Sequence, residues 1–351
     1  MALNKRQLHL IINRLRFLPT GNNLFNYIAN SIKYQLAKKK KKLILPFPNS
    51  IMLELTNHCQ LKCITCAREY SFGSQMARGN MKLELVKKFI DDNHIYIDKL
   101  GLTGLGEPFI YPYLEDLLNY IRIKNKGIII FISTNASLPN SIEILEKIKA
   151  HFNTLQVSID GTGEVFEEIR KNSDFNFFLN NLKNIMEISR RGKFDVKLNM
   201  VVFDKNFKQM KDVVSIANDF GIDEIYFNTI NLVANDWDLK HYELYHTQEF
   251  KEELNASFLL AKKYNINLIF PKMEMMKSFS NCPYPWNNFY ISWDGYLVAC
   301  CAKPFPKELN FGNVFDSGFM NCLNTIDFQK FREMSIKGIS PGFCKRCHYI
   351  E

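Results

Sequence analysis

The stretch IMLELTNHCQLKCITC, residues 51–66, decides how the rest of the chain is interpreted. Its first six residues form an apolar run typical of a buried β-strand, and Cys59, Cys63 and Cys66 follow. Three closely spaced thiolates are one ligand short of a closed four-ligand metal site, so one coordination position is left for chemistry. Two interpretations stay open here. His58 completes a Cys3His zinc site, or the thiolates hold an iron-sulfur cluster with one free iron.

Short apolar runs alternate with longer amphipathic stretches from residue 51 onward. The apolar runs predict strands at 51–56, 97–103, 128–133, 154–159, 196–203 and 223–229. The amphipathic stretches predict helices near 82–93, 111–125, 138–150, 174–190 and 205–220, with a helical insertion near 235–263. This alternation predicts right-handed crossovers and a parallel α/β sheet, either open or curled into a barrel. In both forms function lies at the carboxyl ends of the strands, where the cysteine loop is expected.

Polar residues follow several other predicted strands. They are Gly104–Pro108 (GLGEP) after the second strand, Thr134 and Asn135 after the third, Ser158 and Asp160 at the fourth, and Asn199 within the fifth. Each could serve alone as a turn or a helix cap. Glu107 is the exception, because a carboxylate between Gly106 and Pro108 at a strand end has little structural purpose. The glycines form neither a phosphate-binding loop nor a dinucleotide-binding pattern.

Taken together, the three cysteines and these strand ends resemble the radical S-adenosylmethionine (SAM) superfamily over roughly residues 50–351. The stretch Thr56–Arg68 is similar to the cluster-binding loop of that family, and Gly106-Glu107-Pro108 resembles its glycine-glutamate motif. The resemblance implies a partial (β/α)6 TIM-like barrel of parallel strands. It also implies that the three cysteines hold a [4Fe-4S] cluster that binds SAM.

The resemblance further implies which residues contact SAM. Glu107 and the neighbouring backbone of Gly106 would meet the methionyl amino group, Thr134 and Asn135 the ribose region, Ser158 and Arg170 the carboxylate, and Asn199 the ribose. Arg170 has a simpler alternative as a solvated helix residue. Thr65 departs from the family pattern, in which an aromatic residue often precedes the third cysteine and packs against the adenine. We expect Ile225 or Tyr226 to pack there instead.

A second group of cysteines lies in the C-terminal part of the chain. Asp294-Gly295 stands between two apolar runs and predicts a β-hairpin. Cys282 precedes this hairpin, Cys300 follows it, and the chain nearly ends at Cys344 and Cys347. Four thiolates complete a closed site, which alone would indicate a zinc ribbon. Beside a radical SAM core, the layout resembles the SPASM and Twitch extensions and implies one auxiliary [4Fe-4S] cluster.

Two further cysteines belong to neither group. A full SPASM module holds two auxiliary clusters and needs more cysteines than Cys301 and Cys322, which are the ones present between Cys300 and Cys344. Cys322 lies in a predicted helix, and we expect it to be a buried apolar thiol. Cys301 has two interpretations: a second inert thiol, or a catalytic residue that donates a hydrogen atom to a radical.

Residues 1–50 contain ten Lys or Arg and no acidic residue, whereas the rest of the chain is nearly neutral. Apolar residues recur there at helical spacing, first at Leu8, Ile11, Ile12, Leu15 and Leu18 and then at Leu24, Ile28, Ile32 and Leu36. This segment could lie on an anionic membrane surface or meet an acidic partner, or its two helices could pack against the main domain. An acidic-poor start also resembles a transit peptide, but we do not expect one, because the basic run leads directly into the first core strand.

Length and composition limit the class of protein. A chain of 351 residues with 46% hydrophobic content buries a large core, and nine clustered cysteines favour metal ligation over a disulfide scaffold. No apolar run reaches the length of a membrane span, and no nucleic-acid-binding module is present, so nucleic acid is not an expected partner. We expect a cytoplasmic protein, peripheral to the membrane if its N-terminus binds there. Its expected domains are a basic helical extension (1–48), a radical SAM core (49–275) and an auxiliary-cluster domain (276–351).

The leading functional interpretation is a radical SAM oxidoreductase or epimerase. It uses a 5'-deoxyadenosyl radical to take a hydrogen atom from a hydroxylated small molecule, such as a sugar or cyclitol. The alternative is a maturase that modifies a ribosomally made peptide, although residues 1–50 are shorter and more helical than a leader-recognition domain. A zinc-binding scaffold without catalysis is the alternative of another class. The enzyme interpretations imply a flavodoxin- or ferredoxin-like electron donor.

Overall fold

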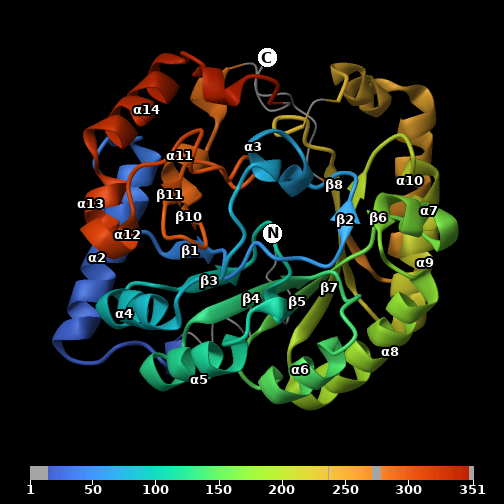
Figure 1. The fold of residues 1–351 in the computed structure, drawn as a ribbon, viewed down its shortest axis with the longest axis horizontal. Coiled ribbons are helices and arrows are strands. Elements are labelled where there is room, and N and C mark those ends of the chain that lie inside the picture. The colour runs from blue at the N-terminus through green and yellow to red at the C-terminus, as the bar shows by residue number, and fades with distance from the viewer. Residues whose placement is uncertain (1–14, 236, 271–277, 348–351) are drawn as a thin grey trace.

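Six parallel strands form the centre of the fold, at the positions that the alternating pattern predicts (Figure 1). The computed structural model describes residues 15–235, 237–270 and 278–347. The six strands are β1 (Ser50–Leu53), β3 (Lys99–Leu102), β4 (Ile129–Thr134), β5 (Thr154–Ser158), β7 (Asp195–Val202) and β8 (Glu224–Thr229). They pair side by side in chain order. A further parallel strand, β9 (Asn267–Ile269), extends this sheet beyond β8 and was not predicted.

Helices follow these strands and cover the outer face of the curved sheet (Figure 1). They are α4 (Leu83–Asn93), α5 (Leu114–Lys124), α6 (Ser141–Ile148), α7 (Gly163–Ile169), α8 (Phe175–Gly192), α9 (Met210–Phe220) and α10 (Gln248–Lys263). Short elements between them are η1 (Ala67–Glu69), α3 (Ser71–Ser74), η2 (Pro108–Ile110), η3 (Phe207–Gln209) and η4 (Leu239–His246).

The strands have one face toward these helices and one face toward the interior of the partial barrel. In β4, Ile130 and Ile132 are fully buried in the core, whereas Phe131 and Ser133 on the other face are partly exposed. Each fully buried isoleucine contributes about 1.5–3 kcal/mol to folding. The helix-facing residues therefore stabilise the sheet, and the inner face stays available for a ligand.

The C-terminal cysteine region joins the same sheet. The predicted hairpin is present as β10 (Tyr290–Ile291) and β11 (Leu297–Val298), with Gly295 at a φ of 92° in the turn. β10 pairs in parallel with β1, so the sheet runs from β11 to β9 and its ends do not meet. The expected partial barrel with a C-terminal hairpin is confirmed. Around the hairpin lie η5 (Phe279–Asn281), α11 (Tyr284–Asn287), α12 (Val314–Ser317), α13 (Phe319–Leu323), α14 (Ile326–Lys337) and η6 (Gly342–Cys344).

The second predicted N-terminal helix is α2 (Asn22–Lys39), and it lies beside the C-terminal helices at the edge of the molecule (Figure 1). The hydroxyl group of Tyr34 donates to the carbonyl of Trp286 at 2.7 Å, and the indole N–H of Trp286 donates to the carbonyl of Lys42 at 2.9 Å. The buried Arg332 donates to the carbonyl of Leu43 at 2.7 Å. The segment after α2 is thus held by C-terminal residues, and the domain boundaries stay predictions.

The first predicted N-terminal helix falls mostly on residues that the structure does not describe. Leu8, Ile11 and Ile12 of the first predicted helix lie outside the described residues. Among the residues that the structure describes, no helix combines the length and apolar character needed to cross a bilayer.

Candidate active site

The cysteine loop after β1 is held by hydrogen bonds to its backbone. The buried guanidinium of Arg68 donates to the carbonyl of Cys59 at 3.2 Å and also to the carbonyl of Leu61. The loop also forms the two-residue strand β2 (Lys62–Cys63), which pairs with β6 (Arg170–Lys171). Burial raises the pKa of all three loop thiols, that of Cys63 to about 12, and metal ligation requires them to lose their protons. Three cysteines on one loop supply three thiolate ligands and leave one position of a four-iron cluster open.

Glu107 lies beside this loop, and four of the predicted residues meet there. Its carboxylate accepts hydrogen bonds from the hydroxyl of Thr134 at 2.9 Å and from the backbone N–H of Asn135 at 2.7 Å. The amide of Asn135 lies 3.6 Å from the sulfur of Cys59. A Cβ at Gly106 would come within 2.3 Å of the carbonyl oxygen of Thr56, so a glycine is required for this close approach. Burial raises the pKa of Glu107 to about 7.

Arg170 lies next to the loop because β6 pairs with β2. Its register partner is Cys63, and its guanidinium forms an ion pair with Asp160, whose Oδ2 is 2.9 Å from Nε. Both side chains are almost fully buried, so Arg170 is not the solvated helix residue of the simpler alternative. Asp160 also accepts from the backbone N–H of Val201 at 2.8 Å, which fixes its position at the ends of β5 and β7.

Ser158 and Asn199 are register partners on neighbouring strands and share the inner face of the sheet. The amide of Asn228 donates to Asn199 at 2.6 Å. Tyr226 pairs in register with Asn199 and lies on the same face, whereas Ile225 is fully buried on the helix side. Of the two residues expected against the adenine, Tyr226 is therefore the one that faces the interior. Ile225 lies on the other face, because adjacent strand residues point to opposite faces, and the contact of Tyr226 with the adenine stays a prediction.

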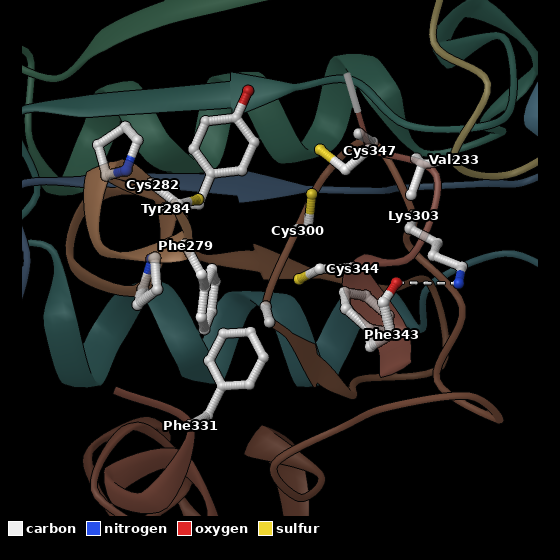
Figure 2. A pocket seen from close by; sticks show the side chains of 14 residues that line it. Val233, Phe279, Cys282, Tyr284, Cys300, Lys303, Phe331, Phe343, Cys344 and Cys347 are labelled. Atoms are coloured by element: carbon white, nitrogen blue, oxygen red, sulfur yellow. Dashed lines mark hydrogen bonds between the residues drawn. The ribbon is translucent and has the colours of Figure 1, made fainter. Parts of the chain in front are cut away.

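A second site lies between the hairpin and the C-terminus. Cys282, Cys300, Cys344 and Cys347 line a cavity of about 210 Å³, whose other walls are mainly apolar (Figure 2). Burial raises the pKa of Cys282 to about 11 and that of Cys344 to about 12. The ammonium group of Lys303, in the same wall, forms an ion pair with Glu308 and donates to the carbonyl of Phe343.

The four predicted ligands of this second site line the same cavity. Within residues 15–235, 237–270 and 278–347, no three His, Cys, Asp or Glu side chains converge on one metal-ion position. Four thiolates, one for each iron, are the ligand set of a closed [4Fe-4S] cluster. The donor set therefore fits an auxiliary cluster by its chemistry.

The two remaining cysteines differ in their surroundings. Cys322 in α13 is buried in the apolar core, as expected. Cys301 does not line the auxiliary cavity, and its sulfur accepts a hydrogen bond from the amide of Asn288 at 3.0 Å. Its role as a hydrogen-atom donor stays a prediction.

Sequence reasoning missed one buried carboxylate that connects the two halves of the molecule. Glu54, directly after β1, accepts from the backbone N–H of Leu105 at 2.8 Å and from that of Trp293 at 3.2 Å. It thereby joins the glycine-glutamate loop to the C-terminal hairpin, and burial raises its pKa to about 7. The available signal was a charged residue inside the apolar run IMLELT, because a buried carboxylate needs hydrogen-bond donors.

Two family models match the chain. The model of the Radical SAM superfamily matches residues 53–217, and that of the SPASM iron-sulfur cluster-binding domain matches residues 282–348.

Curated relatives match over most of the chain. The antilisterial bacteriocin subtilosin biosynthesis protein AlbA of Bacillus subtilis is 26% identical over an alignment 348 residues long, and the match spans 93% of this chain and 75% of AlbA. A probable GTP 3',8-cyclase of Methanocaldococcus jannaschii is 23% identical, and the match spans 78% of this chain and 94% of the cyclase.

Solved structures share the fold. Streptococcus suis SuiB bound to S-adenosylmethionine superposes with a TM-score of 0.67 at 19% identity, covering 95% of this chain and 80% of SuiB. The protein anSMEcpe with bound AdoMet superposes with a TM-score of 0.61 at 16% identity, covering 86% of this chain and 89% of that protein.

Proposed function

This chain is a radical SAM enzyme with a C-terminal SPASM domain, and from that premise we propose that its substrate is a peptide. The observation that carries the peptide proposal is the similarity to AlbA, a bacteriocin biosynthesis protein, over 93% of the chain. SuiB, which shares the fold, has been crystallised bound to the precursor peptide SuiA. The maturase alternative from the sequence therefore becomes the leading proposal.

A hydroxylated small molecule, which was the leading interpretation from the sequence, becomes the second candidate. It is supported by the similarity to probable GTP 3',8-cyclases, whose name gives a nucleotide as the substrate. The polar inner face formed by Ser158, Asn199 and Asn228 is consistent with either substrate, because its polar groups could equally contact the ribose hydroxyls of SAM. A zinc scaffold without catalysis is the weakest alternative, since the C-terminal match is to an iron-sulfur cluster-binding domain.

The residues of the first site have complementary roles in this proposal. Cys59, Cys63 and Cys66 would hold the SAM-binding [4Fe-4S] cluster, and Cys282, Cys300, Cys344 and Cys347 the auxiliary one. When bound, the cluster and SAM would supply, with one electron from a donor, a 5'-deoxyadenosyl radical able to take a hydrogen atom from the substrate.

The chain's polar side chains would orient SAM. The carboxylate of Glu107 would accept the methionyl ammonium, and the fork of Arg170 would donate to the methionyl carboxylate. Thr134, Asn135, Ser158 and Asn199 would contact the ribose region and the carboxylate, as the family resemblance implies. The barrel wall excludes water and fixes the reacting groups relative to one another.

The electron donor would dock on the ribbon formed by β2 and β6. Lys62 and Lys171 are register partners on this ribbon, and both are exposed. Like charges directly opposite each other destabilise an antiparallel pair, and neither lysine has an ion-pair partner among the described residues. We infer that an acidic flavodoxin- or ferredoxin-like protein binds there, one residue from the ligand Cys63, because its charge would relieve this repulsion.

Metal analysis tests the two-cluster part of the proposal. Anaerobically reconstituted enzyme should contain about eight irons, and the Cys59, Cys63 and Cys66 triple Ala variant about four. Stoichiometric zinc with little iron in the parent would instead support the scaffold.

A fractionated extract tests the substrate class. Enzyme with SAM and a reductant is mixed with the peptide-sized and the smaller fraction of an extract of the source cells, and 5'-deoxyadenosine is measured. Stimulation by the peptide-sized fraction that protease treatment abolishes supports a peptide substrate. Stimulation by a protease-resistant small fraction would favour the small-molecule alternative. The triple Ala variant is the control for background cleavage.

A further inference from the structure

Helix α2 departs from the usual amphipathic arrangement. The surface helix of a soluble protein normally turns its apolar face to the core and its polar face to water. The face of α2 that contacts the protein buries Tyr34 and Ala37 in the core and is also held by polar contacts. Tyr27 donates to Asp98 at 2.9 Å, Asn30 donates to the carbonyl of Phe47 at 2.8 Å, and the hydroxyl of Tyr34 donates to a backbone carbonyl.

The opposite face of α2 carries an apolar stripe of Phe25, Ile28, Ile32 and Leu36. The spacing of these residues puts all four on one side of the helix. Their exposed fractions are 74%, 45%, 56% and 51%. The helical spacing in the sequence therefore predicted this element correctly, but this stripe does not pack against the main domain.

Basic residues adjoin the apolar stripe. Lys33 follows Ile32 and is exposed, and Lys39 and Lys40 are exposed at the C-terminal end of the helix. No Asp or Glu occurs anywhere in residues 1–50. A partner that covers the stripe therefore has to accept apolar side chains and positive charge together.

We propose that α2 lies in the plane of an anionic lipid surface and holds the enzyme there. An apolar helix face flanked by lysines is the arrangement that inserts at the boundary of headgroups and acyl chains. Lysines near an anionic leaflet add an electrostatic attraction that falls off within a Debye length. This proposal is independent of which substrate the enzyme modifies.

A second copy of the chain fits this surface less well. Pairing two apolar stripes would bring together two segments that are both basic, with no Asp or Glu in residues 1–50 of either copy to neutralise Lys33, Lys39 and Lys40. Such like-charge repulsion opposes association. A lipid surface supplies both the apolar environment and the counter-charge.

Vesicle co-sedimentation of the full chain tests the proposal. Deleting residues 1–48 is unsuitable, because the backbone groups of Leu43 and Leu45 are bonded to Arg332 and Asn324. The double variant Ile28→Glu/Ile32→Glu changes only exposed side chains. The matched control is Ile123→Glu/Leu259→Glu, at side chains that are 78% and 70% exposed on α5 and α10.

The parent should bind phosphatidylglycerol vesicles more tightly than phosphatidylcholine vesicles, and salt should weaken this binding. The Ile28→Glu/Ile32→Glu variant should lose at least about tenfold in partition, whereas the control keeps the parent's value. Lys33→Gln/Lys39→Gln/Lys40→Gln should lose the preference for anionic lipid. Unchanged iron content in each variant shows that the fold is retained.

Three results would overturn the proposal. The first is a parent that does not bind phosphatidylglycerol vesicles. The second is equal binding by the parent and the Ile28→Glu/Ile32→Glu variant. The third is a dimer in solution that this variant abolishes, because it would assign the apolar stripe to a second copy of the chain.

Discussion

Replacing Arg170 separates its contribution to the fold from its contribution to SAM binding. Its ion pair with Asp160 is 2.9 Å long and almost fully buried. Removing one partner of such a pair leaves the other charge uncompensated, which costs about 3–5 kcal/mol. Arg170→Met should therefore destabilise the enzyme by about this amount, since Asp160 keeps its buried charge.

A second substitution should restore the stability lost in Arg170→Met without restoring the affinity for SAM. Asp160→Asn keeps the oxygen that accepts from the backbone N–H of Val201. The Asp160→Asn/Arg170→Met double variant carries neither charge and should regain most of the lost stability. Its affinity for SAM should stay about ten- to hundredfold lower, because a charged hydrogen bond to the SAM carboxylate contributes about 1.5–3 kcal/mol.

The assay has two readouts on the reconstituted protein under anaerobic conditions. Thermal unfolding reports stability, and equilibrium dialysis with labelled SAM reports affinity at equal iron content. Arg191→Met is the control, because Arg191 pairs with Glu146 at the surface and should change stability by less than about 1 kcal/mol. If the double variant binds SAM as tightly as the parent, Arg170 acts only on the fold, and its assignment to the SAM carboxylate is wrong.

Four further predictions follow from the described contacts. Glu107→Gln should weaken SAM binding at least about tenfold, because only the ionised carboxylate of Glu107 pairs with the methionyl ammonium. The parent should bind SAM more tightly as the pH rises through about 7, and the variant should not. Equilibrium dialysis with labelled SAM measures both effects. Burial raises the pKa of Glu54 from 4.5 to about 7, so the folded parent keeps a proton that the unfolded chain releases, and its free energy of unfolding should fall by about 3 kcal/mol as the pH rises through this window. Glu54→Gln should reduce the measured decline by about this amount in anaerobic unfolding measurements and leave the similar contribution of Glu107, and an equal decline in both proteins would contradict the assignment. Lys62→Glu/Lys171→Glu should slow cluster reduction by an acidic flavodoxin several-fold at low salt, but not by a neutral photoreductant, while Lys88→Glu on α4 leaves both rates unchanged. Cys301→Ala should abolish product and leave the iron content intact, and full activity would end its proposed role as hydrogen-atom donor.

The main strands were predictable because each is a separate apolar run bounded by polar residues. β9 was not, since it has three residues and follows a helical insertion. β2 and β6 have two residues each, too few for a periodic pattern, and they pair across a long separation in the sequence. The position of Arg170 beside Cys63 could therefore be expected from the family resemblance and not from local periodicity.

The residues that a helix or strand contacts in the fold are harder to infer from the sequence than the spacing of its own apolar residues. Helical spacing identified the apolar residues of α2, but the contacts that orient the helix come from Asp98 and Trp286, far along the chain. The same holds for Glu54, whose donors are Leu105 and Trp293. Local sequence carries the periodicity of an element, whereas its neighbours are set by the tertiary fold.

The pairing of β1 with β10 bears on how the protein is synthesised. One edge of β1 pairs with β3, but the other needs Tyr290 and Ile291. These residues leave the ribosome roughly 240 residues later, on the order of ten to fifty seconds at typical elongation rates. During that interval the apolar strand has an open edge, which is a template for aggregation. Ribosome-bound chains that end before residue 290 should therefore depend more on chaperones than chains that include the hairpin.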